Sequence, residues 1–242
     1  MQNIQNNARN TVILGIDSSA KSGAAAVMHG GEILSSQINM SGLTHSQTLM
    51  PMIDSVISKS GVKIEDIEII AVTVGPGSFT GLRIGLSSAK GIAAVTGAEC
   101  IGLSTLEALA FGAKGDGIIC AVMDARVKRV YNALFSRKGA KFTRITDDRT
   151  LEISELLEEL KTYNQPIYLV GDAANICFEQ YKDSIENLSV DEKNINIKGE
   201  SICGLALTKL SDTVNYKQLN PHYIQLPQAQ RELIAKTGGD LK

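Results

Sequence analysis

A buried strand that runs directly into a glycine-rich turn and then into a helix constrains the fold of this chain more than any other feature. Residues Ile69–Val74 form a continuous apolar run rich in β-branched side chains, which is typical of a fully buried strand. The sequence GPGSFTGLR follows at Gly75–Arg83, and a helix is expected from there to Val95. This strand–turn–helix unit predicts an α/β fold.

The residues around this unit complete a first domain. Short apolar runs between Val12 and Asn39, separated by tight turns, predict an antiparallel meander of strands. A core-facing helix follows and ends at Gly61, and a strand at Cys100–Leu103 leads into a helix that reaches Phe111. The apolar positions that define the first of these helices are Leu49, Met52, Ile53, Val56 and Ile57.

A glycine-rich stretch, Gly112–Gly117, is the best candidate for a domain boundary. We therefore predict a disordered lead-in at residues 1–11, a first domain at 12–111 and a second at 112–242. A helix at Ile202–Leu210 is a candidate to pack back on the first domain. In the second domain we expect strands at Ile118–Met123, Val130–Phe135, Lys141–Ile145 and Ile167–Val170, and a helix at Ile153–Tyr163. This order of elements repeats that of the first domain.

Composition excludes several classes of protein. The 242 residues carry a formal charge of −2, so global attraction to nucleic acid or membrane is not expected. The apolar runs are much shorter than the roughly 20 residues that span a bilayer. Isolated cysteines without a C-x-x-C pair favour reduced core residues in a cytoplasmic protein. These are Cys100, Cys120, Cys177 and Cys203.

The motifs for nucleotide, zinc and nucleophilic chemistry are missing from the sequence. There is no P-loop or H-E-x-x-H, and His29, His45 and His222 lie far apart. Asp17 and Asp124 are the carboxylates that the apparent repeat places symmetrically, each at the end of a strand. Two such carboxylates facing a cleft would hold magnesium and phosphate. The alternative, which we favour, is an aspartate that caps a turn at each position.

Three segments together resemble the TsaB family, also called YeaZ: ILGIDSS at Ile13–Ser19, GPGSFTGLR, and DARVKRVYNALF at Asp124–Phe135. The late segment PHYIQ at Pro221–Gln225 also matches. The resemblance implies an actin-like, sugar-kinase-like ATPase (ASKHA) fold of two ribonuclease H-like domains. It also implies a role in bacterial cytoplasm in making threonylcarbamoyladenosine, the modified base next to the anticodon of certain tRNAs.

In that family the chain is not the catalyst but pairs with TsaD, the metal-dependent threonylcarbamoyltransferase, and the ATPase TsaE joins the pair. The family is also compatible with a homodimer when the chain is alone. Here the partner's metal-binding histidine pair is missing, and Asp172 in VGDAAN stands where a phosphate turn has a second glycine. The resemblance therefore implies a non-catalytic subunit of the tRNA-modifying complex without metal or cofactor. The alternative is an actin-like-fold small-molecule kinase or metalloprotease-like enzyme.

The GPGSFTGLR segment itself permits two interpretations. A glycine-rich turn at a helix N-terminus is suited to bind an anion, but we favour a tight strand-to-helix connection capped by Ser78 or Thr80. Small residues then recur along the helix, and each interior glycine costs roughly 1 kcal/mol relative to alanine. Such a stripe lets another helix approach closely. In the TsaB family this helix and the preceding one join helices of TsaD, so the resemblance implies that a TsaD helix packs here; the alternative is packing within the chain's own domain. The predicted partner-binding residues are Leu82, Gly85, Leu86, Ala89 and, on the earlier helix, Met50.

A basic segment lies between Asp124 and Asp147, where no acidic residue intervenes. We predict that Arg137, Lys138 and Lys141 face tRNA phosphates held for the partner enzyme. A solvated hairpin, partly neutralised by the acidic helix that follows, is the alternative. The basic residues of the segment are Arg126, Lys128, Arg129, Arg137, Lys138, Lys141 and Arg144.

Overall fold

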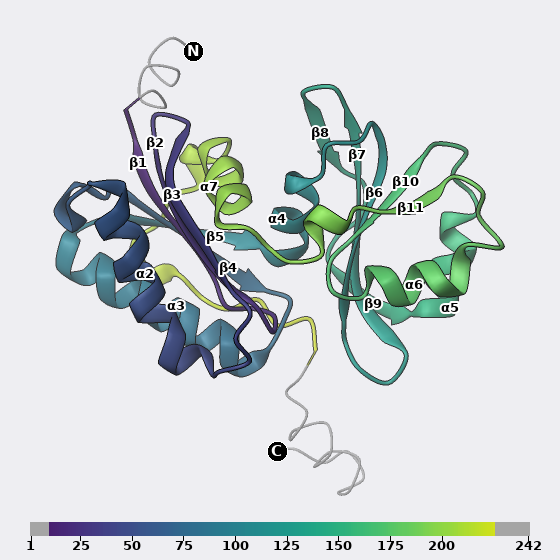
Figure 1. Ribbon diagram of the computed structural model, residues 1–242, viewed down its shortest axis with the longest axis horizontal. Coiled ribbons are helices and arrows are strands. Elements are labelled where there is room, and N and C mark those ends of the chain that lie inside the picture. The colour runs from purple at the N-terminus through teal and green to yellow at the C-terminus, as the bar shows by residue number, and fades with distance from the viewer. Residues whose placement is uncertain (1–9, 226–242) are drawn as a thin grey trace, which may run out of the picture.

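Two β-sheets, each carrying its own helices, form two lobes that lie side by side in the computed structural model, which describes residues 10–225 (Figure 1). The sheet of the first lobe has the order β3-β2-β1-β4-β5 and that of the second β11-β10-β6-β7-β8, with β9 paired to β7. In both sheets a parallel strand (β4 or β10) lies beside the first strand of an antiparallel pair. The two lobes therefore repeat one architecture.

The elements of the first lobe follow the expected order. Its strands are β1 (Val12–Asp17), β2 (Gly23–His29), β3 (Glu32–Asn39), β4 (Ile69–Gly75) and β5 (Glu99–Ser104). Its helices are α2 (His45–Ser60), α3 (Phe79–Thr96) and α4 (Thr105–Gly112), with a 3-10 turn, η1 (Ile64–Asp66). Helices α2 and α3 cover one face of the sheet, and the predicted core positions Leu49, Met52, Ile53 and Val56 of α2 are buried.

The second lobe has short elements that sequence patterns did not predict, namely β9, α6 and β11. Its strands are β6 (Gly117–Asp124), β7 (Arg129–Lys138), β8 (Lys141–Arg144), β9 (Arg149–Glu152), β10 (Ile167–Val170) and β11 (Leu188–Val190). Its helices are α5 (Ile153–Leu160) and α6 (Ala174–Tyr181), followed by the 3-10 turn η2 (Glu192–Asn194). Both helices pack on the sheet through one core that contains the fully buried Tyr181.

The chain then returns to the first lobe. Helix α7 (Gly199–Leu207) begins three residues before the predicted start and packs on β1 and β2, on the sheet face opposite α2 and α3. Two 3-10 turns follow, η3 (Leu210–Asp212) and η4 (Tyr216–Gln218). Between them, Val214 pairs with Cys100 on the edge of β5. Helix α7 and Val214 are thus packed on the first lobe, although they follow the second lobe in sequence.

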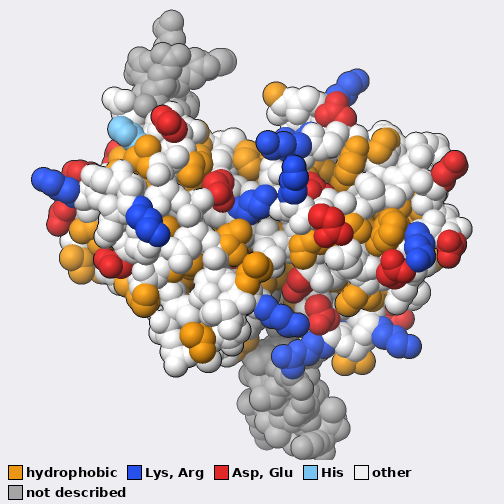
Figure 2. Space-filling view, in the orientation of Figure 1, with side chains coloured by type: hydrophobic (Ala, Val, Ile, Leu, Met, Phe, Trp, Pro, Cys, Tyr) orange, Lys and Arg blue, Asp and Glu red, His pale blue; other side chains and the backbone are white. Residues whose placement is uncertain are grey.

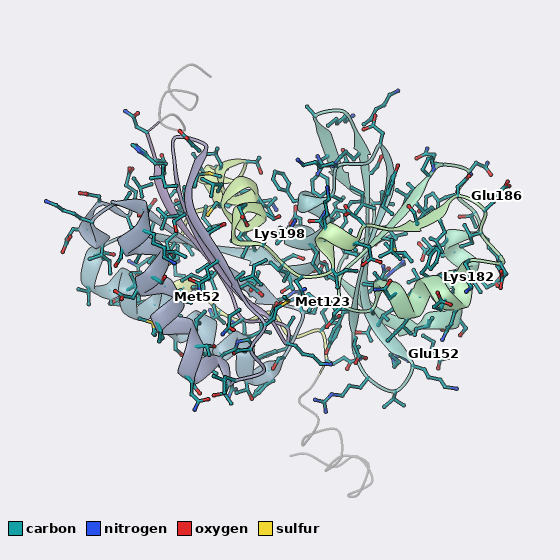
Figure 3. The ribbon with its side chains drawn as sticks, viewed as in Figure 1. Met52, Met123, Glu152, Lys182, Glu186 and Lys198 are labelled. Carbon is teal, nitrogen blue, oxygen red and sulfur yellow. The ribbon has the colours of Figure 1, made fainter. Side chains whose placement is uncertain are left out.

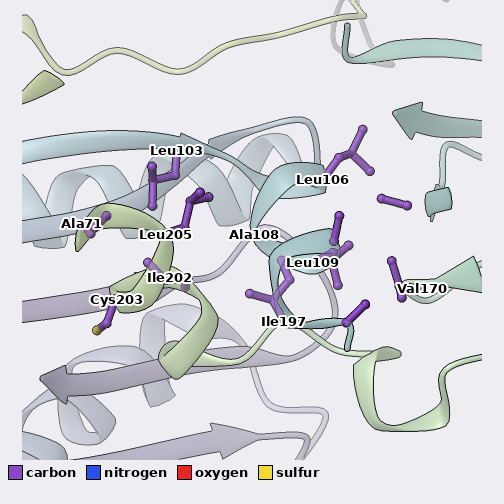
Figure 4. Close-up of a cluster of buried hydrophobic side chains, with 14 of the residues drawn as sticks. Ala71, Leu103, Leu106, Ala108, Leu109, Val170, Ile197, Ile202, Cys203 and Leu205 are labelled. Carbon is purple, nitrogen blue, oxygen red and sulfur yellow. The ribbon is translucent and has the colours of Figure 1, made fainter. Parts of the chain in front are cut away.

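Helices α4 and α7 lie between the two sheets and join the lobes. Figure 4 shows Leu109 of α4 and Ile202 and Leu205 of α7 in one buried apolar cluster, which also contains Leu106 of α4 and Phe135 of the second sheet. Because this cluster draws on both sheets, the relative position of the lobes is set by a shared core. Within residues 10–225, none of the helices is both long and apolar enough to cross a membrane. The predicted lead-in lies outside the described residues, apart from Asn10 and Thr11.

Candidate functional site

A cavity of about 480 Å³ opens between the lobes, where the ends of several strands meet. The first lobe contributes the β1–β2 turn and the GPGSFTGLR segment, and the second contributes the β6–β7 hairpin and the β10–α6 turn. Met123, which lines the cavity, lies between the lobes in Figure 3. The charged side chains of the lining are Lys21, Asp124, Arg126 and Asp172, and its aromatic residues are Phe79, Tyr131, His222 and Tyr223.

Asp17 lies behind this cavity rather than in its wall. Its carboxylate is fully buried, and Oδ1 accepts hydrogen bonds from the Ser19 backbone N–H (3.1 Å), the Ser19 hydroxyl (2.6 Å) and the Thr73 hydroxyl (2.6 Å). Oδ2 is buried without a hydrogen-bond partner. Burial raises the pKa of Asp17, although the hydrogen bonds from Ser19 and Thr73 oppose this.

Asp124, in contrast, is exposed at the cavity. Its Oδ1 accepts a hydrogen bond from the Arg126 backbone N–H (2.7 Å), just as Asp17 accepts one from Ser19 two residues later. The interpretation of both residues as turn-capping aspartates is therefore confirmed. Because Asp17 does not line the cavity, the hypothesis that the two carboxylates face each other there is wrong.

The β10–α6 turn places a second carboxylate in the cavity wall. Asp172 Oδ1 accepts a hydrogen bond from the Asp124 backbone N–H (3.0 Å). Gly171 before it has a φ of +101°, and a Cβ there would lie 2.1 Å from the Val122 carbonyl oxygen. Burial raises the pKa of Asp172, whereas the hydrogen bond from Asp124 and the charge of Lys21 on the other lobe lower it. A carboxylate at this turn disfavours a phosphate group, since like charges repel at close range.

Within residues 10–225, no group of three or more His, Cys, Asp or Glu side chains is placed to hold a metal ion.

The GPGSFTGLR segment is packed tightly against two other backbone segments. Gly75, which precedes a cis peptide bond to Pro76, has a φ of +133°, and a Cβ there would lie 2.2 Å from the His222 carbonyl oxygen. A Cβ on Gly77 would lie 2.4 Å from the Ser19 carbonyl oxygen, which accepts a hydrogen bond from the Ser78 N–H (2.7 Å). These contacts, with the Ser78 cap of α3, agree with the tight-connection interpretation that we favoured.

The structure corrects the predicted partner surface on α3. Leu82, Leu86 and Ala89 are at most 4% exposed and face the core of the first lobe. A Cβ on Gly85 would lie 2.5 Å from the Ser18 hydroxyl oxygen, so this glycine admits the β1–β2 turn rather than another protein. Packing within the domain, the alternative interpretation, accounts for these residues. Of the five predicted residues only Met50, at 48% exposure, lies at the surface.

The three predicted tRNA-facing residues differ in how far their side chains are exposed to solvent. Arg137 is partly buried: its Nη2 donates to the Phe111 carbonyl oxygen (2.8 Å), and its guanidinium lies 4.9 Å from the centre of the Phe142 ring. Burial lowers the pKa of Arg137. Lys138 and Lys141 pair across the tip of the β7–β8 hairpin and are exposed. Figure 2 shows basic side chains at this upper end of the second lobe. Arg137 thus braces the hairpin, while the two lysines remain available.

Sequence reasoning missed a strained hairpin beside the cavity. Arg126, Val127 and Lys128 all have positive φ angles, of 66°, 52° and 58°. Such angles are unfavourable for residues with a Cβ, especially for a β-branched one such as Val127. None of the three is a typical turn residue, so nothing in the sequence signals this conformation.

Comparisons with known proteins place the chain among proteins of tRNA threonylcarbamoyladenosine biosynthesis. The family model of TsaD, tRNA N6-adenosine threonylcarbamoyltransferase, matches residues 32–230. The tRNA threonylcarbamoyladenosine biosynthesis protein TsaB of Bacillus subtilis (strain 168) is 28% identical over 227 residues, which cover 92% of this chain and 97% of that protein. TsaB of Escherichia coli (strain K12) is 35% identical over 128 residues, about half of each chain (52% and 55%).

Among solved structures, YeaZ from Pseudomonas aeruginosa superposes with a TM-score of 0.72 at 23% identity. The match covers 88% of this chain and 99% of that one. This similarity shows that the chain shares the fold of that YeaZ protein, and the two repeated sheets confirm the predicted α/β class.

Proposed function

The chain belongs to the TsaB (YeaZ) family of tRNA threonylcarbamoyladenosine biosynthesis proteins, and on this premise we propose that it is a cytoplasmic, non-catalytic subunit that pairs with TsaD. The observation that carries the proposal is the outward face of α2 and α3, where Met50, Gly91 and Val95 are exposed and packing within the chain does not explain them. TsaE and tRNA complete the proposed assembly.

The outward face of α3 is a row of residues four apart: Arg83, Ser87, Gly91 and Val95. All four are exposed, Val95 at 88%. Unlike Gly85, Gly91 faces open space, because a Cβ there would meet no atom within 4 Å. A glycine in the interior of an exposed helix costs roughly 1 kcal/mol relative to alanine. A partner helix that approaches closely at Gly91 would explain why a glycine stands at this position despite its cost to the helix.

Met50 extends this surface to α2, which contacts α3 within the lobe. Met50 is 48% exposed, and an exposed methionine is suited to pack against the side chains of another helix, because its flexible thioether fills irregular gaps. The docking face as we define it therefore comprises Met50, Arg83, Ser87, Gly91 and Val95. It replaces the buried stripe that the sequence suggested.

A non-catalytic role is supported by the chemistry of the cavity. The carboxylate of Asp172 stands in the turn that would approach a phosphate, and its Oδ1 is bonded to the Asp124 N–H. Oδ1 of Asp17 is saturated by three donors from its own lobe. Both groups are engaged in holding turns, so neither is arranged as a general base for a substrate in the cavity.

The docking face is tested by Gly91→Leu. The substitution favours the helix by about 1 kcal/mol, since leucine is a much better helix former than glycine. In a close helix–helix contact it costs roughly 1–3 kcal/mol, or about 5- to 150-fold in affinity. We expect calorimetric titration with TsaD to show this loss while thermal stability rises. Gln180→Leu, on the exposed side of α6 in the second lobe, is the matched control, and unchanged binding by Gly91→Leu would contradict the proposal.

The role itself is tested by reconstituting threonylcarbamoyl transfer to tRNA from TsaD, TsaE and the enzyme that supplies threonylcarbamoyl-AMP. We expect modification only when both TsaD and this chain are present. Activity of this chain without TsaD would instead favour an enzyme, such as a kinase of this fold. Full activity of TsaD without this chain would refute the subunit role.

A further inference from the structure

The segment Pro221–Gln225, here called the C-terminal strap, forms one wall of the cavity between the lobes. Its residues His222–Gln225 line the cavity although they follow the last helix by many residues. The His222 N–H donates to the Val74 carbonyl oxygen (2.7 Å), and the His222 carbonyl oxygen would lie 2.2 Å from a Cβ on Gly75. The strap is therefore seated on the end of β4 by its backbone.

One side chain fastens the strap to α3. The Tyr223 ring stacks on that of Phe79 with a centroid separation of 4.7 Å and an interplanar angle of 30°. Arg83 Nε donates to the Tyr223 hydroxyl oxygen (3.1 Å), and the Arg83 guanidinium lies 3.9 Å from the centre of the Phe79 ring. Arg83 thus holds both rings from the solvent side.

Arg83 also belongs to the docking face, one turn before Ser87 and two turns before Gly91. A single exposed side chain therefore belongs to the proposed partner surface and also contacts Tyr223 and Phe79, which line the cavity. Two sites that share one side chain can be coupled energetically if binding at each of them changes the contacts of that side chain.

We propose that Arg83 and Tyr223 couple docking of TsaD on α3 to the position of the C-terminal strap, an inference that rests on the proposed function. A partner helix over the docking face excludes water from Arg83. The Arg83–Tyr223 hydrogen bond and the cation–π contact with Phe79 are stronger in that less polar environment. Docking then holds the strap more firmly and fixes the cavity wall. By linkage, loosening the strap lowers the affinity for TsaD by the same factor.

The readout is the exchange of the His222 amide hydrogen in the full-length chain, measured with and without saturating TsaD. We expect TsaD to slow this exchange by about fivefold or more, the lower end of typical coupling. Tyr223→Phe keeps the ring stack but removes the hydroxyl acceptor, so TsaD should no longer slow the exchange, and its affinity should fall by the same factor. Arg83→Lys, which keeps the charge but loses the planar stack, should also abolish the protection. Tyr168→Phe, in the second lobe, is the matched control.

The outcomes separate this inference from the function on which it rests. Failure of the wild-type chain to bind TsaD contradicts the proposed function. Binding that leaves the His222 exchange unchanged overturns the coupling alone. So does a Tyr223→Phe variant that retains both the protection and the wild-type affinity. Loss of protection in both variants, with normal behaviour of Tyr168→Phe, supports the coupling.

Discussion

Two glycines of the same helix should respond to alanine in opposite directions. Gly85 and Gly91 both lie in α3, but Gly85 faces the β1–β2 turn and Gly91 faces open space. In Gly91→Ala only the helix propensity changes, so we expect the free energy of unfolding to increase by about 1 kcal/mol. For a chain of this size such a gain raises the Tm by roughly 2–4 °C.

Gly85→Ala gains the same propensity but introduces a Cβ 2.5 Å from the Ser18 hydroxyl oxygen. That hydroxyl is buried and donates to the Gly81 carbonyl oxygen at 2.8 Å. Displacing it leaves a buried polar group unsatisfied, at about 1–3 kcal/mol, and overpacking costs about 1–3 kcal/mol more. When the gain of about 1 kcal/mol in helix propensity is subtracted, Gly85→Ala should lower the free energy of unfolding by roughly 1–5 kcal/mol.

Urea unfolding followed by circular dichroism measures both effects, provided that the variants keep the m-value of the wild type. Ser18→Ala removes the atom that the new Cβ meets, so Gly85→Ala should cost at least about 1 kcal/mol less in that background. The reasoning is refuted if the two alanine variants change stability in the same direction. It is also refuted if the Ser18→Ala background makes no difference.

Two further predictions concern charge. Because burial raises the pKa of Asp17 above its usual value of 3.8, the folded state resists ionisation, and the wild type loses stability as the pH rises through and above this value. Asp17→Asn does not ionise, so its stability relative to the wild type should increase as the pH rises above the usual aspartate pKa of 3.8, and a flat difference in urea midpoints would contradict this. Replacing Lys138 and Lys141 by glutamate should weaken tRNA binding by the assembled complex and reduce the slope of log affinity against log salt by about 1–2. An unchanged slope would remove the hairpin from the RNA-binding surface.

Periodicity was sufficient for the parts of the fold that local sequence determines. The meander of the first lobe, the buried strand β4 and the apolar face of α2 follow from alternation and helical spacing, because each element buries its own apolar side. Asp17 and Asp124 as turn-capping residues also followed, since the hydrogen bond spans only two residues.

The orientation of α3 was beyond the reach of such patterns. Glycine occurs on both sides of this helix, at 85 and at 91, and a glycine that admits its own domain cannot be distinguished in sequence from one that faces solvent. The role of Arg137 was hidden for a related reason, because its aromatic neighbours Phe111 and Phe142 come from other elements. The C-terminal strap depends on contacts between segments that lie far apart in sequence, since Arg83 and Tyr223 are separated by 140 residues.

The return of α7 to the first lobe has a consequence for how the protein is made on the ribosome. The inner face of β1 and β2 is covered by a helix whose residues begin at Gly199. At roughly 5–20 residues per second, the apolar face of the nascent amino-terminal sheet stays uncovered for several seconds to half a minute after its own strands have emerged. Contacts of such long sequence separation also slow folding. The amino-terminal half is therefore a natural client for chaperones during synthesis, and the two lobes mature together only once the carboxy-terminal residues are released.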